Sequence, residues 1–327
     1  MTLVYSTLRL LFAGSLAAVA LSACTNLRTE IDPSELPGEP EKIVVYGYIS
    51  PQDTILSVRV GRSKPVLGDG AEAVPFNINN ATVSINNGTQ TVRLTYNSTD
   101  QVYRVKASTL PIRAGQTYTL DVSTPDGKRV TAQANVPKPI AIQSVRIDSS
   151  IVDAGTAWKK SYLMTISWQD PVGEENFYRY GGTFNWNPNQ AYPINGQPKP
   201  SPVTLRTIPF QRENTTGNLV TDKNQDGVVL SSQSSSEIVN VSLDDKVPNA
   251  QTQVAKIRLG SVYPGATVTA QLLHLDKLYY RYANAVINQR RNRDNPFAEP
   301  VLIPTNIVGG LGCFVGYNRT DKAILLR

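Results

Sequence analysis

The stretch Val-Ser-Ile-Asn-Asn-Gly-Thr-Gln-Thr-Val-Arg-Leu-Thr-Tyr, residues 83–96, decides the fold that the sequence predicts. Val83 and Ile85 alternate with polar residues before Asn87-Gly88, and apolar residues return at every second position after it. A period of two is typical of a half-buried strand. Asn-Gly between two such runs is the strongest local signal of a β-hairpin. We therefore expect two antiparallel strands joined by a tight turn.

A second hairpin is predicted farther along the chain. Tyr118, Leu120 and Val122 share one face, Pro125-Asp126-Gly127 supplies a turn, and the alternation resumes up to Val136. Proline fixes φ at the first turn position, and glycine accepts the left-handed one. The runs 43–49 and 55–60, which precede both hairpins, are rich in β-branched and aromatic residues. These short strands predict a β-sandwich of immunoglobulin or fibronectin type over residues 42–137.

Pro137-Lys138-Pro139 marks the expected domain boundary, because proline cannot donate to a β-ladder. Residues 138–327 are predicted to form a second β-rich domain with one long helix over 277–290. Asp276 is the expected N-cap of this helix, and Leu278, Tyr282 and Ala285 lie on its apolar stripe. The fold class is thus expected to be mainly all-β. The strands predicted in this half are 162–168, 177–186, 203–208, 237–243, 254–259, 266–273 and 323–326.

The amino terminus carries the pattern of a lipoprotein signal peptide. An apolar run over residues 10–23 ends in Leu21-Ser22-Ala23-Cys24, with small residues before a cysteine. The run is shorter than the ~20 residues that span a bilayer, and it fits a secretory signal. We expect residues 1–23 to be removed and Cys24 to carry a lipid; an ordinary signal peptide with a chance cysteine is the alternative. The proline-rich residues 24–41 are expected to form a tether.

The charge of the chain argues against nucleic acid as a partner. The formal net charge is +6 over 327 residues, and the basic residues are dispersed. They do not alternate with aromatic residues in the manner that tracks single-stranded nucleic acid. One basic cluster, Arg290, Arg291 and Arg293, ends the predicted helix. Its cations are favourable at a helix carboxyl terminus, and contact with anionic lipid head groups or a partner is the alternative.

Two cysteines are present, and lipidation of Cys24 would leave Cys313 without a disulfide partner. Cys313 lies between Gly312 and Phe314 in a strand-like stretch. We expect it to be a small buried apolar residue.

The sequence Asp222-Lys223-Asn224-Gln225-Asp226-Gly227 matches the first positions of a calcium loop. In such a loop, alternate oxygens converge on the ion and glycine makes a sharp turn. Gln233 stands where a bidentate acid is required, so the match is incomplete. The segment is expected to be a polar turn between strands. A structural calcium bound by Asp222, Asn224 and Asp226 is the alternative, and no other cofactor is expected.

An aromatic segment from Phe177 to Trp186 is the candidate for ligand or partner contact. Tyr178, Tyr180 and Trp186 offer rigid amphipathic surfaces that suit glycans or peptides. The same alternation also fits a core strand, with Phe177 and Arg179 on one face and the two tyrosines on the other. Core packing and recognition both remain open.

Catalytic constellations are mostly absent from the sequence. His274 is the single histidine, and no nucleophile elbow or metal-binding histidine spacing accompanies it. Glu174-Glu175 is a carboxylate pair, but adjacent residues point apart. We expect His274 to be structural and the protein not to be an enzyme.

Two segments of the sequence carry distinctive motifs. The first is Asp-Pro-Val-Gly-Glu-Glu-Asn-Phe-Tyr-Arg, residues 170–179. The second joins Asp-Asn-Pro-Phe-Ala-Glu-Pro, residues 294–300, to Asn-Ile-Val-Gly-Gly-Leu-Gly, residues 306–312. In this order they resemble the domain-of-unknown-function family 4249 of Bacteroidetes lipoproteins. A similarity at 115–120 extends the resemblance over the expected mature chain, although 313–316 departs from the family's pattern.

The resemblance implies an outer-membrane lipoprotein, often encoded beside a TonB-dependent transporter, without an assigned activity. Both segments also have a structural explanation in turns and close backbone approach. If they instead form a docking surface for the transporter, Glu174 and Arg179 are the polar contacts expected there. We therefore expect a lipid-anchored accessory or binding protein of the outer membrane that partners a transporter in nutrient uptake. A structural or adhesive envelope lipoprotein is the alternative.

Overall fold

The computed structural model describes residues 41–63, 76–153, 157–186, 206–210, 218–242, 266–295 and 297–326. The predicted signal peptide, Cys24, the tether up to residue 40 and the predicted strand 254–259 lie outside these residues. Within them the chain is mainly β-structure with a single α-helix, α3 (Lys277–Asn292), so the predicted fold class is confirmed. Over the described ranges, α3 falls short of the length and apolar character that crossing a membrane requires.

The first part of the chain forms the predicted sandwich around one hydrophobic core. Val45, Val58, Ile85 and Leu120 lie in this core with almost no exposure. The strands are β1 (Ile43–Ile49), β2 (Ile55–Arg62), β3 (Thr82–Asn86), β4 (Thr91–Asn97), β5 (Val102–Lys106), β6 (Thr117–Ser123) and β7 (Arg129–Asn135).

Both predicted hairpins are present. Strand β3 pairs antiparallel with β4, and β6 pairs antiparallel with β7. In the first hairpin Ile85 lies opposite Val92, and Gly88 in the turn has a φ of +95°. A φ of this sign is readily adopted by glycine, which is why the Asn-Gly pair is informative.

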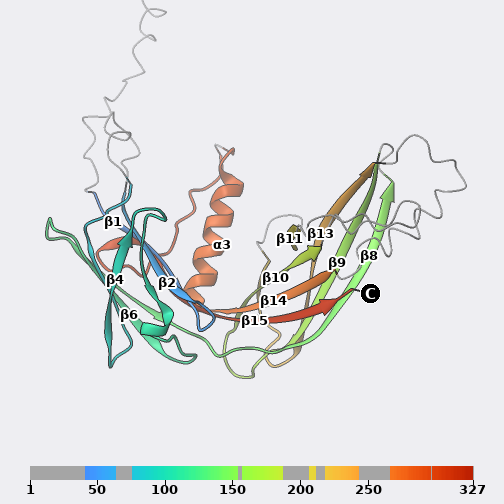
Figure 1. Cartoon of the computed structure of the whole chain (residues 1–327), viewed down its shortest axis with the longest axis horizontal. Coiled ribbons are helices and arrows are strands. Elements are labelled where there is room, and N and C mark those ends of the chain that lie inside the picture. The colour runs from blue at the N-terminus through green and yellow to red at the C-terminus, as the bar shows by residue number, and fades with distance from the viewer. Residues whose placement is uncertain are drawn as a thin grey trace, which may run out of the picture. The chain divides into compact units, whose positions relative to one another are not determined.

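The second part contains two facing sheets (Figure 1). The order β13-β9-β8 makes one sheet, and β11-β10-β14-β15 forms the end of a longer sheet, with β12 paired to β10. Trp168 of β9 and Tyr178 of β10 meet edge to face in the core between them, with ring centroids 5.2 Å apart. The strands are β8 (Ile142–Asp153), β9 (Ala157–Gln169), β10 (Phe177–Trp186), β11 (Arg206–Phe210), β12 (Leu219–Thr221), β13 (Val229–Ser242), β14 (Thr267–Leu275) and β15 (Gly310–Leu325).

Strand β15 differs from the sequence prediction. The sequence predicts a short strand at 323–326, but the structure has one strand of 16 residues that begins at Gly310 and ends at Leu325. It pairs in parallel with β1 and antiparallel with β14. A Cβ on Gly312 would lie 2.0 Å from the carbonyl oxygen of Val45, so this glycine permits the close approach of β1. Cys313 is buried, as predicted.

The domain boundary predicted at residues 137–139 stays a prediction. Two separate hydrophobic cores lie on its two sides. However, β15 contributes Phe314 to the first core and pairs with β14 of the second part. The end of the chain therefore completes both parts.

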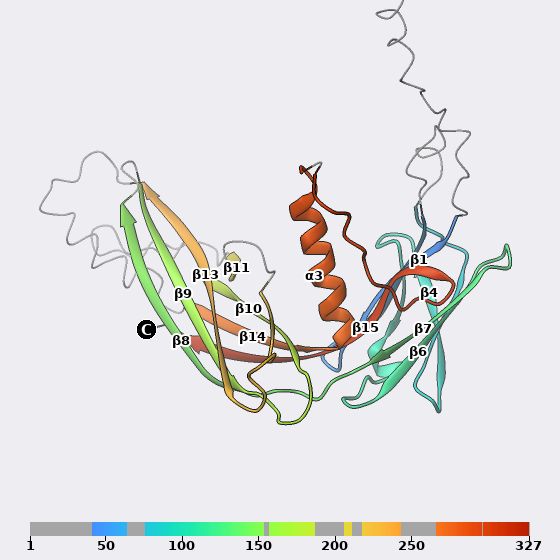
Figure 2. The same ribbon diagram turned by 180° about the vertical axis from the view of Figure 1, so that it is seen from behind.

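Helix α3 begins where the sequence predicts. The carboxylate of Asp276 accepts hydrogen bonds from the backbone N–H groups of Leu278 and Tyr279 at 2.5 and 3.3 Å, which is the N-cap arrangement. The helix packs on β15 and β10. Figure 2 shows it from behind, with the chain leaving its far end and returning to β15.

Candidate functional site

The aromatic residues of β10 lie mainly in the core. Tyr178 is fully buried and Tyr180 is 2% exposed, and both belong to the core between the facing sheets. Phe177, on the opposite face, packs on Tyr280 of α3 with ring centroids 4.9 Å apart. The predicted alternation is thus present, and packing accounts for these rings. Trp186 ends the strand, and its side chain lies outside the described residues.

The outer face of β10 borders a groove of about 460 Å³, here called the Arg179 groove. Its walls combine a guanidinium, an amide and a hydroxyl with apolar side chains, a mixture typical of ligand sites. The main contributors come from β10, β11 and β14: Arg179, Gly181, Thr183, Phe210, Gln271 and Leu273.

Gly181 keeps this groove open. A Cβ built on Gly181 would meet its nearest atom, the carbonyl oxygen of Phe210, at 3.4 Å, which is an ordinary contact. At the neighbouring Gly182, a Cβ would lie only 2.4 Å from the carbonyl oxygen of Thr269 and 3.0 Å from Met164. Gly182 is therefore required for packing, whereas a side chain at Gly181 would fill the groove.

Arg179 supplies the positive charge of the groove and is exposed. Burial raises the pKa of Tyr279 on α3, whereas the charge of Arg179 and a hydrogen bond with it act in the opposite direction. The guanidinium is charged at any physiological pH and presents several N–H donors. The groove is consequently suited to a ligand or partner segment with an acidic group.

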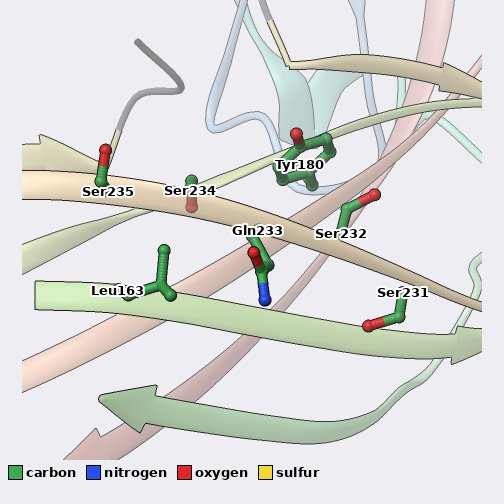
Figure 3. A pocket seen from close by; sticks show the side chains of 7 residues that line it. All are labelled: Leu163, Tyr180, Ser231, Ser232, Gln233, Ser234 and Ser235. Carbon is green, nitrogen blue, oxygen red and sulfur yellow. The ribbon is translucent and has the colours of Figure 1, made fainter. Parts of the chain in front are cut away.

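A second hollow, of about 470 Å³, lies at β13 and is called the serine pocket here. Figure 3 shows its lining, with Ser231, Ser232, Gln233, Ser234 and Ser235 along β13, joined by Leu163 and Tyr180. None of these side chains carries a formal charge.

Ser234 is the most constrained residue of the serine pocket. It is 1% exposed, and its hydroxyl finds no hydrogen-bond partner among the described residues. A buried hydroxyl without a partner costs free energy, so a polar ligand that supplied one would be favoured there. Tyr180 lines both this pocket and the Arg179 groove.

Three carboxylates meet at the base of the loop that precedes β10. Ligand atoms of Asp170, Asp222 and Asp226 lie within 4.8 Å of one another. Asp170 opens the 170–179 segment, and the other two belong to the predicted calcium loop, which here connects β12 to β13. Two of the three are buried: Asp170 is 1% and Asp222 3% exposed.

Each carboxylate of this cluster accepts hydrogen bonds from nearby backbone. Asp170 accepts from the N–H of Gly227 at 2.9 Å, and Asp222 from that of Asn176 at 2.8 Å. Asp226 accepts from the N–H of Gly173 through both oxygens, at 2.9 and 3.1 Å. These bonds join the two loops.

The calcium prediction remains a prediction at this cluster. The structure brings Asp222 and Asp226 together as expected, and it adds Asp170, which the sequence prediction did not include as a ligand. Asn224 is exposed and has a left-handed backbone, with φ of +66°. No spacing rule connects residues 170 and 222, so only the pairing of the strands could have revealed the third carboxylate.

His274 occupies a structural position. Its Nδ1 lies 2.8 Å from the carbonyl oxygen of Lys138, and its ring stacks on Tyr178 with centroids 5.3 Å apart. Burial lowers the pKa of His274, while the Lys138 carbonyl and the charges of the nearby acids, Asp170 first, act against this shift. The ring is therefore held between its neighbours and favours the neutral form.

The two adjacent glutamates have different surroundings. Glu175 forms an ion pair with Lys277 at the start of α3, at 2.6 Å. Glu174 is exposed and lines a shallow hollow over the carboxylate cluster. Arg179 lines a different hollow, so the two residues expected to share a docking surface border separate sites.

Comparison with known proteins gives a family match. The model of a family described as "Domain of unknown function (DUF4249)" matches residues 25–323, which is most of the chain. No curated protein matches this sequence.

Proposed function

Since this chain belongs to the DUF4249 family, we propose that it is a lipid-anchored, non-enzymatic binding protein of the outer membrane. Its lipid would be carried by Cys24, at the end of the signal-like segment Leu21–Cys24. In this proposal it assists a TonB-dependent transporter in nutrient uptake. The family match itself assigns no activity.

The observation that carries the binding role is the Arg179 groove. It combines an exposed cation with amide, hydroxyl and apolar side chains, and glycine at position 181 keeps its floor empty. A groove of this composition binds an amphipathic ligand or a partner segment with an acidic group facing Arg179. The neutral serine pocket on the other side of Tyr180 would contact the uncharged part of a larger ligand.

The surroundings of His274 support a role without catalysis. A general base needs access to its substrate and a pKa near the working pH. His274 is 8% exposed, is held at Lys138 and stacks on Tyr178. The three aspartates close by accept hydrogen bonds from the loop backbone, which is a structural use of their oxygens.

The test is purification of the lipidated protein from its native outer membrane in mild detergent, followed by mass spectrometry. We expect an acylated Cys24 at the mature amino terminus and a stoichiometric TonB-dependent barrel in the same fraction. Recovery of the acylated protein alone would favour a structural or adhesive envelope protein. A mature terminus without lipid would contradict the anchor.

Two variants connect this result to the groove. Gly181→Leu fills the groove without a backbone clash, and Arg179→Glu reverses its charge. Both are expected to reduce the yield of the barrel or of a bound small molecule about tenfold or more. Thr95→Leu and Arg93→Glu, on the exposed side of β4, are the matched controls. Equal recovery with all four variants would exclude the groove as the binding site.

A further inference from the structure

Helix α3 runs antiparallel to β1. Tyr279, in the first turn of the helix, packs on Tyr48 near the end of β1, with ring centroids 5.3 Å apart. Tyr282, one turn later, approaches Tyr46, with ring centroids 6.5 Å apart. The carboxyl end of α3 therefore points toward the residues where β1 begins.

The segment after the helix confirms this direction. It leads from Asn292 back to Gly310, and Gly310 lies beside Ile43 in the parallel ladder of β15 and β1. Figure 2 shows this return of the chain. Arg290 is eight residues beyond Tyr282, about 12 Å along the helix at 1.5 Å per residue. The basic cluster thus lies toward the end of the fold where the tether enters β1.

The segment that follows the helix exposes large apolar side chains. Phe297 is 94% and Leu302 is 91% exposed. Arg290, Arg291 and Arg293 are also exposed and outnumber the acidic Asp294 and Glu299 of the same segment. The helix dipole accounts for cations at a helix end, but it gives no reason for an exposed phenylalanine and leucine in the segment that follows them.

We propose that this end of the fold docks on the anionic phospholipid surface of the bilayer that holds Cys24. The docking surface consists of Arg290, Arg291, Arg293, Phe297 and Leu302. Arginines are attracted to an anionic surface, and exposed aromatic and leucine side chains insert at the boundary of head groups and acyl chains. This proposal rests on the proposed lipid anchor.

The length of the predicted tether gives a reason for a second membrane contact. Residues 25–41 could reach about 50 Å if extended at roughly 3.1 Å per residue. An anchor on so long a tether holds the protein near the membrane without fixing which side faces it. A docking surface beside the start of β1 would fix that orientation.

Vesicle co-sedimentation tests the surface independently of acylation. The probe is residues 24–327 carrying Cys24→Ser, mixed with vesicles of phosphatidylcholine alone or with phosphatidylglycerol added. We expect binding only to the anionic vesicles, with strong weakening by salt. The combined substitutions Arg290→Gln, Arg293→Gln and Phe297→Ser should lower the partition coefficient at least about tenfold.

The control removes equal charge and one exposed apolar residue elsewhere. Arg104→Gln changes a half-exposed residue of β5, and Arg146→Gln and Val172→Ser change exposed residues of β8 and of the loop before β10. Their combination should keep vesicle binding, and circular dichroism should show both variants folded.

Equal binding to both vesicle types, or equal loss in both variants, overturns the docking surface. A third result would also overturn the proposal: the parent chain does not bind vesicles, and the triple variant at 290, 293 and 297 no longer co-purifies with a barrel from native membranes. The surface would then bind a protein partner. The lipid anchor is tested separately, by mass spectrometry of the mature amino terminus. A terminus without lipid would overturn the anchor, whatever the vesicle assay shows.

Discussion

The hydroxyl of Tyr178 donates a hydrogen bond to Oδ1 of Asp170 across 2.5 Å, and neither residue is more than 1% exposed. This bond connects the first residue of the 170–179 segment to the strand that the segment leads into. Burial raises the pKa of Tyr178, and the hydrogen bond and the negative charge of Asp170 raise it further. The phenol therefore remains the donor in this pair.

The first prediction is that Tyr178→Phe destabilises the protein. Removing the hydroxyl leaves a buried carboxylate oxygen short of a donor, which costs about 1–3 kcal/mol. Urea unfolding followed by fluorescence would measure this loss. Tyr180→Phe is the matched control, because Tyr180 lies two residues along on the same face and lines the serine pocket. Equal losses of unfolding free energy in both variants would show that the hydrogen bond to Asp170 adds no measurable stability.

The second prediction concerns pH. The pKa of His274 is lowered in the folded protein, so the unfolded chain binds the proton more readily. The contribution of His274 to the free energy of unfolding should therefore be fully present above the unfolded pKa of about 6.5. It should decline as the pH falls below this value. His274 is the single histidine of the chain, and urea midpoints between about pH 7.5 and 5.5 cover the range in which the unfolded chain gains this proton.

His274→Gln provides the control for the pH effect. Its amide can still donate to the Lys138 carbonyl, but it has no proton to gain over this range. Asp170, Glu174 and Asp222, the acids that act on His274, stay in place. A slope that persists unchanged in the variant would assign the pH dependence to other groups.

Local patterns predicted those elements whose partners are close in sequence. The Asn87-Gly88 turn fixed the β3–β4 hairpin, and the Asp276 cap fixed the start of α3. The strand at 177–186 was also predicted to its ends, because its aromatic alternation is sustained. In these cases the signal and the structure it specifies lie within a few residues of each other.

The missed features depend on contacts between distant segments. Strand β5 has an irregular burial pattern and β12 has only three residues, so neither shows a clear period. The course of β15 follows from its parallel pairing with β1, more than 260 residues away in the chain. The closeness of Asp170 to Asp222 and the open groove at Gly181 likewise depend on how segments distant in the sequence pack together.

The third prediction tests the calcium loop. Three carboxylates within 4.8 Å repel one another, and a divalent cation that bound them only in the folded state would raise the melting temperature. A structural calcium, the alternative to a polar turn, would make calcium chloride raise the Tm of the parent chain, by an amount corresponding to about 2.7 kcal/mol at a hundredfold excess over Kd. The shift should disappear in Asp226→Asn and persist in Asp126→Asn, a change in an exposed turn. An unchanged Tm at millimolar calcium would leave the cluster as a hydrogen-bonded loop junction.

The fourth prediction is that Gly312→Ala disrupts the junction of β1 and β15. Gly312 has a φ of +100°, and a Cβ there would lie 2.0 Å from the carbonyl oxygen of Val45. The variant combines backbone strain with separation of the two strands, so we expect a loss of at least about 3 kcal/mol. Gly88→Ala is the control, because Gly88 has a similar φ of +95° but nothing within 4 Å of the added atom. It should cost only the strain, about 1 kcal/mol. Urea unfolding followed by far-ultraviolet circular dichroism compares the two, and similar losses would mean that β1 and β15 adjust to the methyl group without separating.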